Sequence, residues 1–367
     1  MALGTKCSYN NSMLDLGQLF MTGISGKTLL DEEAKFIAHN NIGGVLLFSK
    51  NFESPAQLAE LVNSIQALRK DFPLFIAVDH EGGRVIRFKQ GFTQFPPMLD
   101  ISSLDSPKMV FDTATIMASE LSSCGINVNF SPCCDVLTNE KNQVIGDRSF
   151  SCEPDKVAKF VSSAIRGFQT NNILSCAKHF PGHGSTFADS HEKLPIVKTS
   201  MEDLEKCELI PFNKAIKARV EFVMMGHLQV DCIDQELPCS LSPRAHKLLR
   251  SKMRFSKIIV SDDMQMGAIT KSYSVQEAAV LALRAGTDLL EYRDMDQMNI
   301  ALEGVRLAIK EKSLNIGELE KSVARIRECK VRTLKEYKPI YLPALSQVFN
   351  KKTSQVFLQN LQDKIEQ

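Results

Sequence analysis

The sequence predicts an α/β protein that folds as one (β/α)8 TIM-type barrel, and three observations support this class. Eight short apolar runs recur along the chain of 367 residues, and segments with helical periodicity separate them. The runs are almost continuously hydrophobic, as is typical of parallel strands buried on both faces. Eight such units over roughly 300 residues match the size of a barrel, and no linker rich in Gly, Ser or Pro divides them.

The expected strands can be placed in chain order, with helices between them. They occupy residues 18–24, 43–49, 74–79, 126–132, 173–179, 222–228, 257–263 and 287–292. Helix starts are marked by Ser54, which offers a cap before Pro55 in the first turn, with Gln57 at the capping-box position. Ser274 and Glu277 repeat this spacing, which predicts a second capped helix.

An open doubly wound sheet is the structural competitor of the barrel. Such a sheet usually carries a GxGxxG or GxxxxGK[ST] loop that holds phosphates, and neither motif is present. We therefore expect a catalytic barrel over residues 1–338. Residues 339–367 begin with prolines and end in a weak helical pattern, and we expect them to form a C-terminal extension that packs on the barrel.

Composition indicates a globular protein with a substantial core, since 44% of the residues are hydrophobic and 24% are charged. The formal net charge of +1 argues against a broad electrostatic contact with nucleic acid, although local basic patches stay possible. No stretch approaches the roughly 20 apolar residues that span a bilayer, and the first residues lack a basic segment followed by an apolar core. We expect a cytoplasmic monomer without membrane insertion.

The ten cysteines are scattered and form no CxxC pair. Several of them, including Cys133, Cys134 and Cys176, lie in apolar runs. Buried reduced thiols are therefore favoured over a disulfide framework or a zinc knuckle.

Polar side chains follow several of the expected strands at the point where each strand ends. They are Asp79, Asp135, Lys178, His179, His227, Asp262 and Asp263. Each has a structural alternative, because Asp often caps a loop or helix and a lone His is more often hydrogen-bonded in the core. In barrel enzymes, however, the chemistry lies at the carboxyl ends of the strands. The coincidence across five strands favours an active site.

The stretch KHFPGHGSTFADSH, residues 178–191, holds three of the seven histidines of the chain. Pro181 and Gly182 prevent a continuous helix there, so the clustering predicts an active-site loop. The same break argues against a helical zinc pair at His179 and His183, and there is no HExxH motif. We expect no metal and no cofactor; ligands drawn from several strands are the alternative that stays open.

At these residues the sequence resembles glycoside hydrolase family 3 and, within it, the bacterial β-N-acetylglucosaminidases of peptidoglycan recycling. The matching segments are IGGVLLFSKN (42–51), VDHEGGRVIRF (78–88), GFTQFPPM (91–98), NFSPCCDV (129–136), IGDRSF (145–150), KHFPGHGSTFADSHEKLP (178–195) and SDDMQMGA (261–268). They cover the whole expected barrel, and the KHFPGHG…DSH stretch is highly specific. The resemblance implies a retaining enzyme that removes terminal β-linked N-acetylglucosamine from fragments such as GlcNAc-1,6-anhydroMurNAc, with or without a peptide.

The resemblance also implies roles for individual residues. Asp262 is similar to the catalytic nucleophile of the family, and His191 to its acid/base, with Asp189 as the partner that orients the imidazole. The residues that would bind the sugar are Asp79, Arg87, Arg148, Lys178 and His179.

Some positions depart from the family pattern. Met225 and Gly226 stand where small or hydroxyl residues are usual, and Cys133–Cys134 replace aliphatic residues. The end of the eighth strand, Glu291–Arg293, is more polar than the usual aliphatic ending and would alter the pocket wall. Three alternative functions stay open: a β-N-acetylglucosaminide phosphorylase on the same site, a plain β-glucosidase, and an inactive barrel that binds wall fragments as a sensor.

Overall fold

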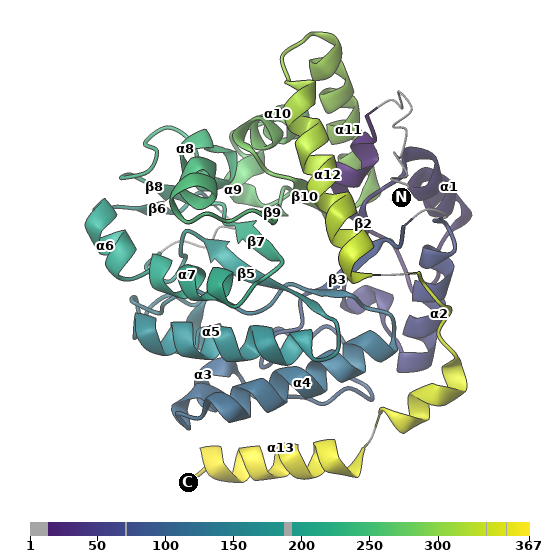
Figure 1. Ribbon diagram of the computed structural model, residues 1–367, viewed down its shortest axis with the longest axis vertical. Coiled ribbons are helices and arrows are strands. Elements are labelled where there is room, and N and C mark those ends of the chain that lie inside the picture. Colours follow the sequence, from purple (N-terminus) through teal and green to yellow (C-terminus); the bar gives the residue numbers. More distant parts are fainter. Residues whose placement is uncertain (1–13, 70–71, 187–192, 335, 350) are drawn as a thin grey trace, which may run out of the picture.

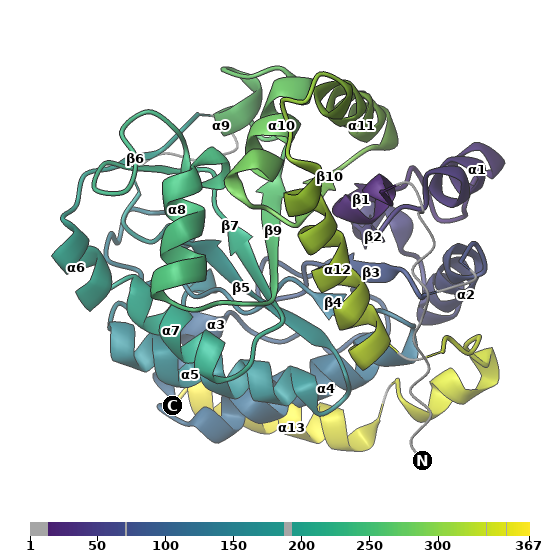
Figure 2. The ribbon, with the colours of Figure 1, turned by 45° about the horizontal axis from the view of Figure 1, so that its top comes forward.

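The computed structural model describes residues 14–69, 72–186, 193–334, 336–349 and 351–367. Eight parallel strands close into a barrel, in the ring order β1-β10-β9-β7-β5-β4-β3-β2 (Figures 1 and 2). Their bounds are β1 Phe20–Gly23, β2 Gly44–Leu47, β3 Phe75–Val78, β4 Val128–Asn129, β5 Leu174–Phe180, β7 Phe222–Met225, β9 Ile258–Asp263 and β10 Leu289–Tyr292. The predicted fold class is confirmed.

Each barrel strand overlaps one of the eight apolar runs that predicted it. The strands are shorter than the runs, except that β5 continues one residue past its run to Phe180. A separate two-stranded sheet, β6 (Ile196–Val197) with β8 (Gln229–Val230), was not predicted. Each of its strands is only two residues long, too short for a periodic pattern.

Helices surround the strands in both views (Figures 1 and 2). The longer ones are α1 Asp31–Asn40, α2 Pro55–Gln66, α4 Pro107–Ser123, α5 Pro154–Gln169, α7 Leu209–Lys217, α10 Val275–Ala285, α11 Met295–Lys310, α12 Ile316–Thr333 and α13 Lys352–Ile365. The shorter ones are α3 Met98–Ser103, α6 Met201–Lys206, α8 Pro243–Lys247 and α9 Gly267–Thr270. The predicted caps are present: Ser54 Oγ accepts from Gln57 N at 3.2 Å, and Ser274 Oγ from Glu277 N at 3.3 Å.

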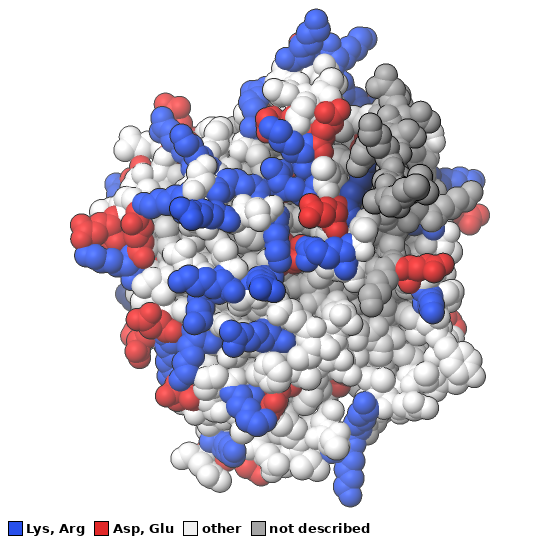
Figure 3. Space-filling view, in the orientation of Figure 1, with Lys and Arg blue, Asp and Glu red and all other residues white. Residues whose placement is uncertain are grey.

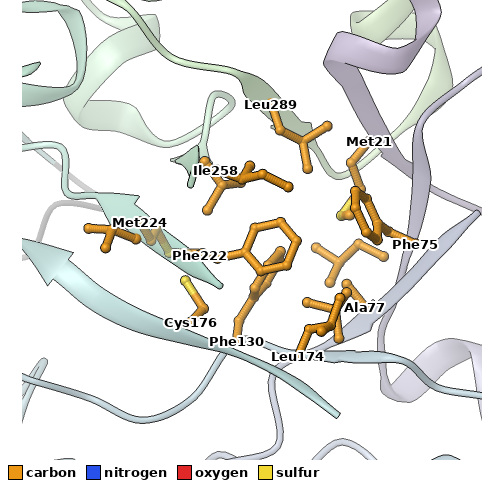
Figure 4. Close-up of a cluster of buried hydrophobic side chains, with 14 of the residues drawn as sticks. Met21, Phe75, Ala77, Phe130, Leu174, Cys176, Phe222, Met224, Ile258 and Leu289 are labelled. Atoms are coloured by element: carbon orange, nitrogen blue, oxygen red, sulfur yellow. The ribbon is translucent and has the colours of Figure 1, made fainter. Parts of the chain in front are cut away.

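The interior of the barrel is filled by large apolar side chains (Figure 4). Phe222 lies at the centre, with its ring centroid 5.3 Å from that of Phe75 and 6.5 Å from that of Phe130. Leu174 and Ile258 pack around them. Since this part of the barrel is closed to water, polar chemistry is confined to the strand ends.

The C-terminal residues pack on the outside of the barrel. The side chain of Asn63 on α2 binds both the N–H and the carbonyl of Ile340, and the ring of Phe349 packs edge-on against Phe92 at 4.9 Å. Helix α13 lies against α3. The division of the chain at residue 338 stays a prediction.

The surface carries charges of both signs. Figure 3 shows that Lys and Arg side chains gather on the face of α5 and α7, with Asp and Glu among them. Among the described residues, no helix has the length and apolar character needed to cross a membrane.

The amino-terminal end of the barrel is closed by α12, which places Lys330 inside. Its Nζ donates to Gln18 Oε1 at 2.8 Å and to the carbonyl of Gly43 at 2.6 Å, and it lies 4.8 Å from the ring centroid of Phe75. Burial, and then the neighbouring charge of Arg69, lower the pKa of Lys330 to about 7.

We expect the Lys330→Met variant to change how stability depends on pH. The unfolded lysine has a pKa near 10.4, so between about pH 7 and that value the unfolded wild type binds more protons than the folded protein. Its free energy of unfolding should rise with pH over this window, by up to about 1.4 kcal/mol per pH unit, and fall as the pH drops towards 7. Urea titrations at pH 7 and pH 9 measure this slope, which the variant should lack.

The matched control is Lys321→Met, since Lys321 is exposed on the same helix. It should keep the wild-type slope. Equal slopes in all three proteins would contradict the assignment of this titration to Lys330.

Candidate active site

The layer of side chains above the apolar interior is made of ionisable groups. Side chains alternate along a strand, so residues two positions beyond an interior residue point to the same side. Ala77, Cys176 and Leu289 lie in the interior (Figure 4). Two positions beyond these interior residues lie Asp79, Lys178 and Glu291, and Asp262 on β9, four positions beyond the interior Ile258, lies in the same layer. The charged groups therefore meet at the carboxyl end of the barrel.

Lys178 is the centre of this layer, with a side chain that is 2% exposed. Its Nζ lies 2.7 Å from Asp79 Oδ1 and 2.7 Å from Glu81 Oε1. Burial alone would lower the pKa of Lys178, but the charges of Asp79 and Glu81 raise it above its ordinary value. Lys178 is therefore a permanently charged cation inside the barrel.

Two arginines complete the network. Arg148, in the 3-10 helix Gly146–Arg148, holds Glu81 with two bonds, Nε to Oε2 at 2.9 Å and Nη2 to Oε1 at 2.8 Å. Arg87 Nη2 lies 3.3 Å from Asp79 Oδ2. Burial would raise the pKa values of both carboxyls, but the cations lower them: Lys178 and Arg87 act on Asp79, and Arg148 and Lys178 act on Glu81. Both acids are therefore ionised at neutral pH.

The structure thus brings together four of the predicted sugar-binding residues, and it adds Glu81, which the sequence analysis missed. Glu81 is 3% exposed and shares its carboxylate between two cations. It does not end a strand but lies two residues past Asp79 in the loop that follows β3. The sequence feature that could have identified Glu81 as a site residue is its place within the VDHEGGR segment.

His179, the fifth predicted sugar-binding residue, is oriented by Asp135. Its Nδ1 lies 2.7 Å from Asp135 Oδ2 and so donates to it, and the backbone N–H of His183 donates to Asp135 Oδ1 at 2.7 Å. The other ring nitrogen of His179, Nε2, lies 3.4 Å from Arg148 Nη2 and is left to act as an acceptor. The structure assigns Asp135 a positioning role in the site.

Cys133, Asp135 and His179 also place three donor atoms within 4.8 Å of one another. Asp135 Oδ2 already accepts from His179 Nδ1 and, at 3.1 Å, from Cys133 Sγ. Burial and the charge of Asp135 raise the pKa of the Cys133 thiol well above its ordinary value, so it stays protonated as a donor. Hydrogen bonding within the set explains this cluster without a metal.

Asp262 differs from the other acids because its side chain forms no ion pair with a described residue and is only partly buried. Its Oδ1 accepts from the N–H of Asp263 at 2.8 Å. Burial would raise its pKa, but His179, His227 and Lys178 lower it. Among the described residues, Asp262 is therefore an ionised carboxylate without an ionic partner, and it lies beside the predicted sugar-binding residues.

His227 and Asp263 have structural roles, which was the alternative to a catalytic role that the sequence left open for each of them. His227 Nε2 donates to the carbonyl of Asp263 at 2.9 Å, so its Nδ1 accepts from Ser240 Oγ at 2.7 Å. Burial lowers the pKa of His227 and keeps the ring neutral. Asp263 caps the turn after β9 by accepting from Gln265 N, and it pairs with Arg293 at 2.5 Å.

His191 and Asp189 lie outside the described residues. The segment before them is placed by close backbone contact: a Cβ at Gly184 would lie 1.6 Å from the carbonyl oxygen of Val136. Gly226, one of the departures from the family pattern, allows a close but less tight approach, since a Cβ there would lie 2.6 Å from Leu228 Cδ2 and 3.1 Å from the Cβ of His179. The glycines let this loop and β7 pack tightly against the site.

The described cysteines are free, and Cys133, Cys134 and Cys176 are buried, as predicted. Cys176 lies directly beneath the charged layer, and burial raises its pKa well above the ordinary value. It is a neutral part of the floor, unsuited to act as a nucleophile.

The fold and this site together define a class of protein. Paired carboxylates and cations in a barrel mouth suit the hydroxyl groups of a sugar, and a separate ionised carboxylate suits attack on an anomeric carbon. These are features of a barrel glycosidase.

Comparison with known proteins identifies the family. The family model described as "Glycosyl hydrolase family 3 N terminal domain" matches residues 13–329, and the chain belongs to this family. A curated protein named "Beta-hexosaminidase" from Nitrosomonas eutropha is 39% identical over 281 residues, which are 75% of this chain and 80% of that protein. A second with that name, from Methylobacillus flagellatus, is 36% identical over 277 residues, 74% of this chain and 78% of the relative.

A solved structure agrees with this assignment. The glycoside hydrolase family 3 β-N-acetylglucosaminidase from Paenibacillus sp. superposes with a TM-score of 0.91 at 32% identity. The match covers 98% of this chain and 68% of that one.

We expect Glu81→Gln to destabilise the protein by about 3–5 kcal/mol at pH 7, because it leaves Lys178 and Arg148 with less buried negative charge. The folded pKa of Glu81 is depressed, so its contribution is complete above the unfolded value near 4.3 and is lost as the pH falls below it. Urea unfolding at pH 7 and pH 3.5 should show that the difference in the free energy of unfolding between wild type and variant is smaller at pH 3.5.

The control for this prediction is Glu303→Gln, since Glu303 forms an exposed pair with Arg306. It should change stability by no more than about 0.5 kcal/mol. The predicted ion-pair network would be contradicted if the free energies of unfolding of wild type and Glu81→Gln differed only slightly, or if their difference stayed constant down to pH 3.5.

Proposed function

We propose that this protein is a retaining β-N-acetylglucosaminidase that removes terminal β-linked N-acetylglucosamine, with Asp262 as nucleophile. The observation that carries the proposal is the carboxylate of Asp262, ionised, partly open and unpaired, beside a ring of sugar-binding charges. The names of the curated relatives and of the Paenibacillus structure support the choice of sugar.

In the first step Asp262 attacks the anomeric carbon while a proton is delivered to the departing oxygen. We assign that proton to His191, with Asp189 binding its other ring nitrogen and so fixing the tautomer. In the second step the same imidazole removes a proton from water, which releases the sugar with its configuration retained. The reference pKa of histidine, near 6.5, suits it to both tasks at neutral pH.

The remaining site residues hold the sugar and set the charge around it. Asp79 and Glu81 supply acceptors for ring hydroxyls, while Arg87 and Arg148 supply donors. Lys178 fixes the positions of both acids and helps to keep Asp262 ionised. These residues raise the affinity for a distorted sugar, and Asp262 with His191 performs the bond changes.

For the substrate we propose a peptidoglycan fragment such as GlcNAc-1,6-anhydroMurNAc, with or without its peptide, acted on by a monomer in the cytoplasm. The buried, unbridged thiols support a reducing compartment. Incubation with this disaccharide and with chitobiose tests the preference. Addition of phosphate to the same assay tests for the phosphorylase alternative, which would yield a sugar 1-phosphate.

Asp262→Ala should leave at most a trace of hydrolysis of an aryl β-N-acetylglucosaminide, because the neighbouring ionised acids Asp79, Glu81 and Asp263 are each paired with a cation and cannot replace the nucleophile. The release of the aryl group is followed by absorbance, and NMR of the fresh wild-type product should show the β-anomer. Asp363→Ala, an exposed change on α13, controls for general effects. Residual activity in a folded Asp262→Ala protein, or an inverted product, would refute the two-step route.

His191→Ala should reduce the hydrolysis of substrates with poor leaving groups by roughly 10²–10⁴-fold, and that of activated aryl glycosides far less, because only a poor leaving group needs the proton. Asp189→Ala should have a smaller effect of the same kind without abolishing binding. The measurement is kcat/KM on chitobiose and on a dinitrophenyl glycoside. Equal losses on both substrates would assign His191 to positioning instead.

A further inference from the structure

Glu291, at the end of β10, is a buried acid that the proposed mechanism does not use. Leu289 points into the barrel (Figure 4), so Glu291, two residues further along the same strand, lies one layer nearer the site. Both of its backbone polar groups are bonded to β9 and the turn that follows it: its N–H donates to Ser261 Oγ at 2.9 Å, and its carbonyl accepts from Met264 N at 3.0 Å. The side chain therefore has a defined place beside Asp262.

The surroundings of this side chain are mostly acidic. Glu291 is 5% exposed, and Oε2 is buried without a hydrogen-bond partner among the described residues. The titratable groups that act on it from the packed elements are Asp79 on the β3 side, Cys176 and Lys178 on β5, and Asp262 and Asp263 on β9. The other neighbouring strand, β1, carries no titratable group.

The cations nearby are already engaged. Lys178 binds Asp79 and Glu81, Arg87 pairs with Asp79, and Arg293 pairs with Asp263. A further negative charge at Glu291 would therefore be unpaired and close to Asp79 and Asp262. Burial, and then the charges of Asp79, Asp263 and Asp262, raise the pKa of Glu291 well above its ordinary value.

We propose that Glu291 binds the sugar as a neutral carboxylic acid and donates a hydrogen bond to an uncharged oxygen, a hydroxyl or the acetamido carbonyl. This inference rests on the proposed glycosidase function and adds a specificity residue to it. A protonated carboxyl suits such an acceptor because it offers a donor in a layer whose other members on β3 and β9 are acceptors. It also leaves the negative charge of Asp262 undisturbed.

The ionisation of Glu291 can be tested without any substrate. A buried acid with a raised pKa keeps its proton when folded and loses it when unfolded, so the wild type should lose stability as the pH rises above the unfolded value of about 4.3. Glu291→Gln removes this titration. The melting temperature of the variant minus that of wild type should grow by about 2 °C per pH unit between pH 5 and pH 8.

Glu318→Gln, an exposed change on α12, is the control and should show no such growth. A difference between Glu291→Gln and wild type that is independent of pH would overturn the proposal, because Glu291 would then be ionised in the folded protein.

The donor role is tested by comparing Glu291→Gln with Glu291→Leu. The amide still donates, so its kcat/KM on an aryl β-N-acetylglucosaminide and its affinity for N-acetylglucosamine should stay within about threefold of wild type. Leucine removes the donor, and both quantities should fall about tenfold. If the leucine variant does not fold, Glu291→Met, unbranched and without a donor, takes its place.

The remaining outcomes are also decisive. If the glutamine and apolar variants have the same kcat/KM and the same affinity for N-acetylglucosamine, a donor role is excluded. If Glu291→Gln alone loses most of its kcat/KM, the function belongs to a carboxylate. If wild type cleaves no β-N-acetylglucosaminide, the proposed function fails. In that case the melting temperatures still decide whether Glu291 is neutral, and calorimetry with N-acetylglucosamine still decides whether it binds sugar.

Discussion

The ammonium group of Lys178 lies inside the barrel, and the arrangement of the site follows from the need to balance that charge. A buried cation is tolerated only with close anionic partners, and Asp79 and Glu81 supply them at 2.7 Å each. These acids then need cations of their own, which Arg87 and Arg148 provide. The strand β5, the loop after β3 and a 3-10 helix are thereby fixed relative to one another, and the predicted sugar-binding groups are oriented before any ligand arrives.

The two ends of the barrel show how strongly partners decide the state of a buried lysine. Lys178 has two carboxylates within hydrogen-bond distance, and its pKa is raised. Lys330, at the opposite end, donates among the described residues only to the amide oxygen of Gln18 and the carbonyl of Gly43, and its pKa is lowered. Burial acts in the same direction on both. A buried lysine therefore stays fully charged at the carboxyl end of the barrel because the acids there compensate its charge.

The fold could be predicted from the sequence because each barrel strand is a buried apolar run, and burial on both faces removes polar residues from it. Residues that end such runs, such as Lys178 and Asp262, could also be recognised. Glu81 could not, because it follows a strand by three residues and its importance comes from a pairing with Arg148 across 67 residues of chain. Two-residue strands such as β6 and β8 depend on tertiary pairing and leave no local pattern.

The adjacent acids Asp262 and Asp263 show what a sequence pattern leaves undecided. The pattern indicates that one of them caps the following turn, and the resemblance alone assigns the nucleophile to the first. In the structure Asp263 is bound by Arg293 and by the N–H of Gln265, so its charge is committed. Among the described residues, the Asp262 carboxylate accepts only from the adjacent backbone N–H of Asp263, and its anionic state is favoured by neighbouring side chains that do not touch it, Lys178 among them. A nucleophile needs this combination, since a direct ion pair would stabilise the carboxylate before the reaction and would have to be broken to form the covalent bond.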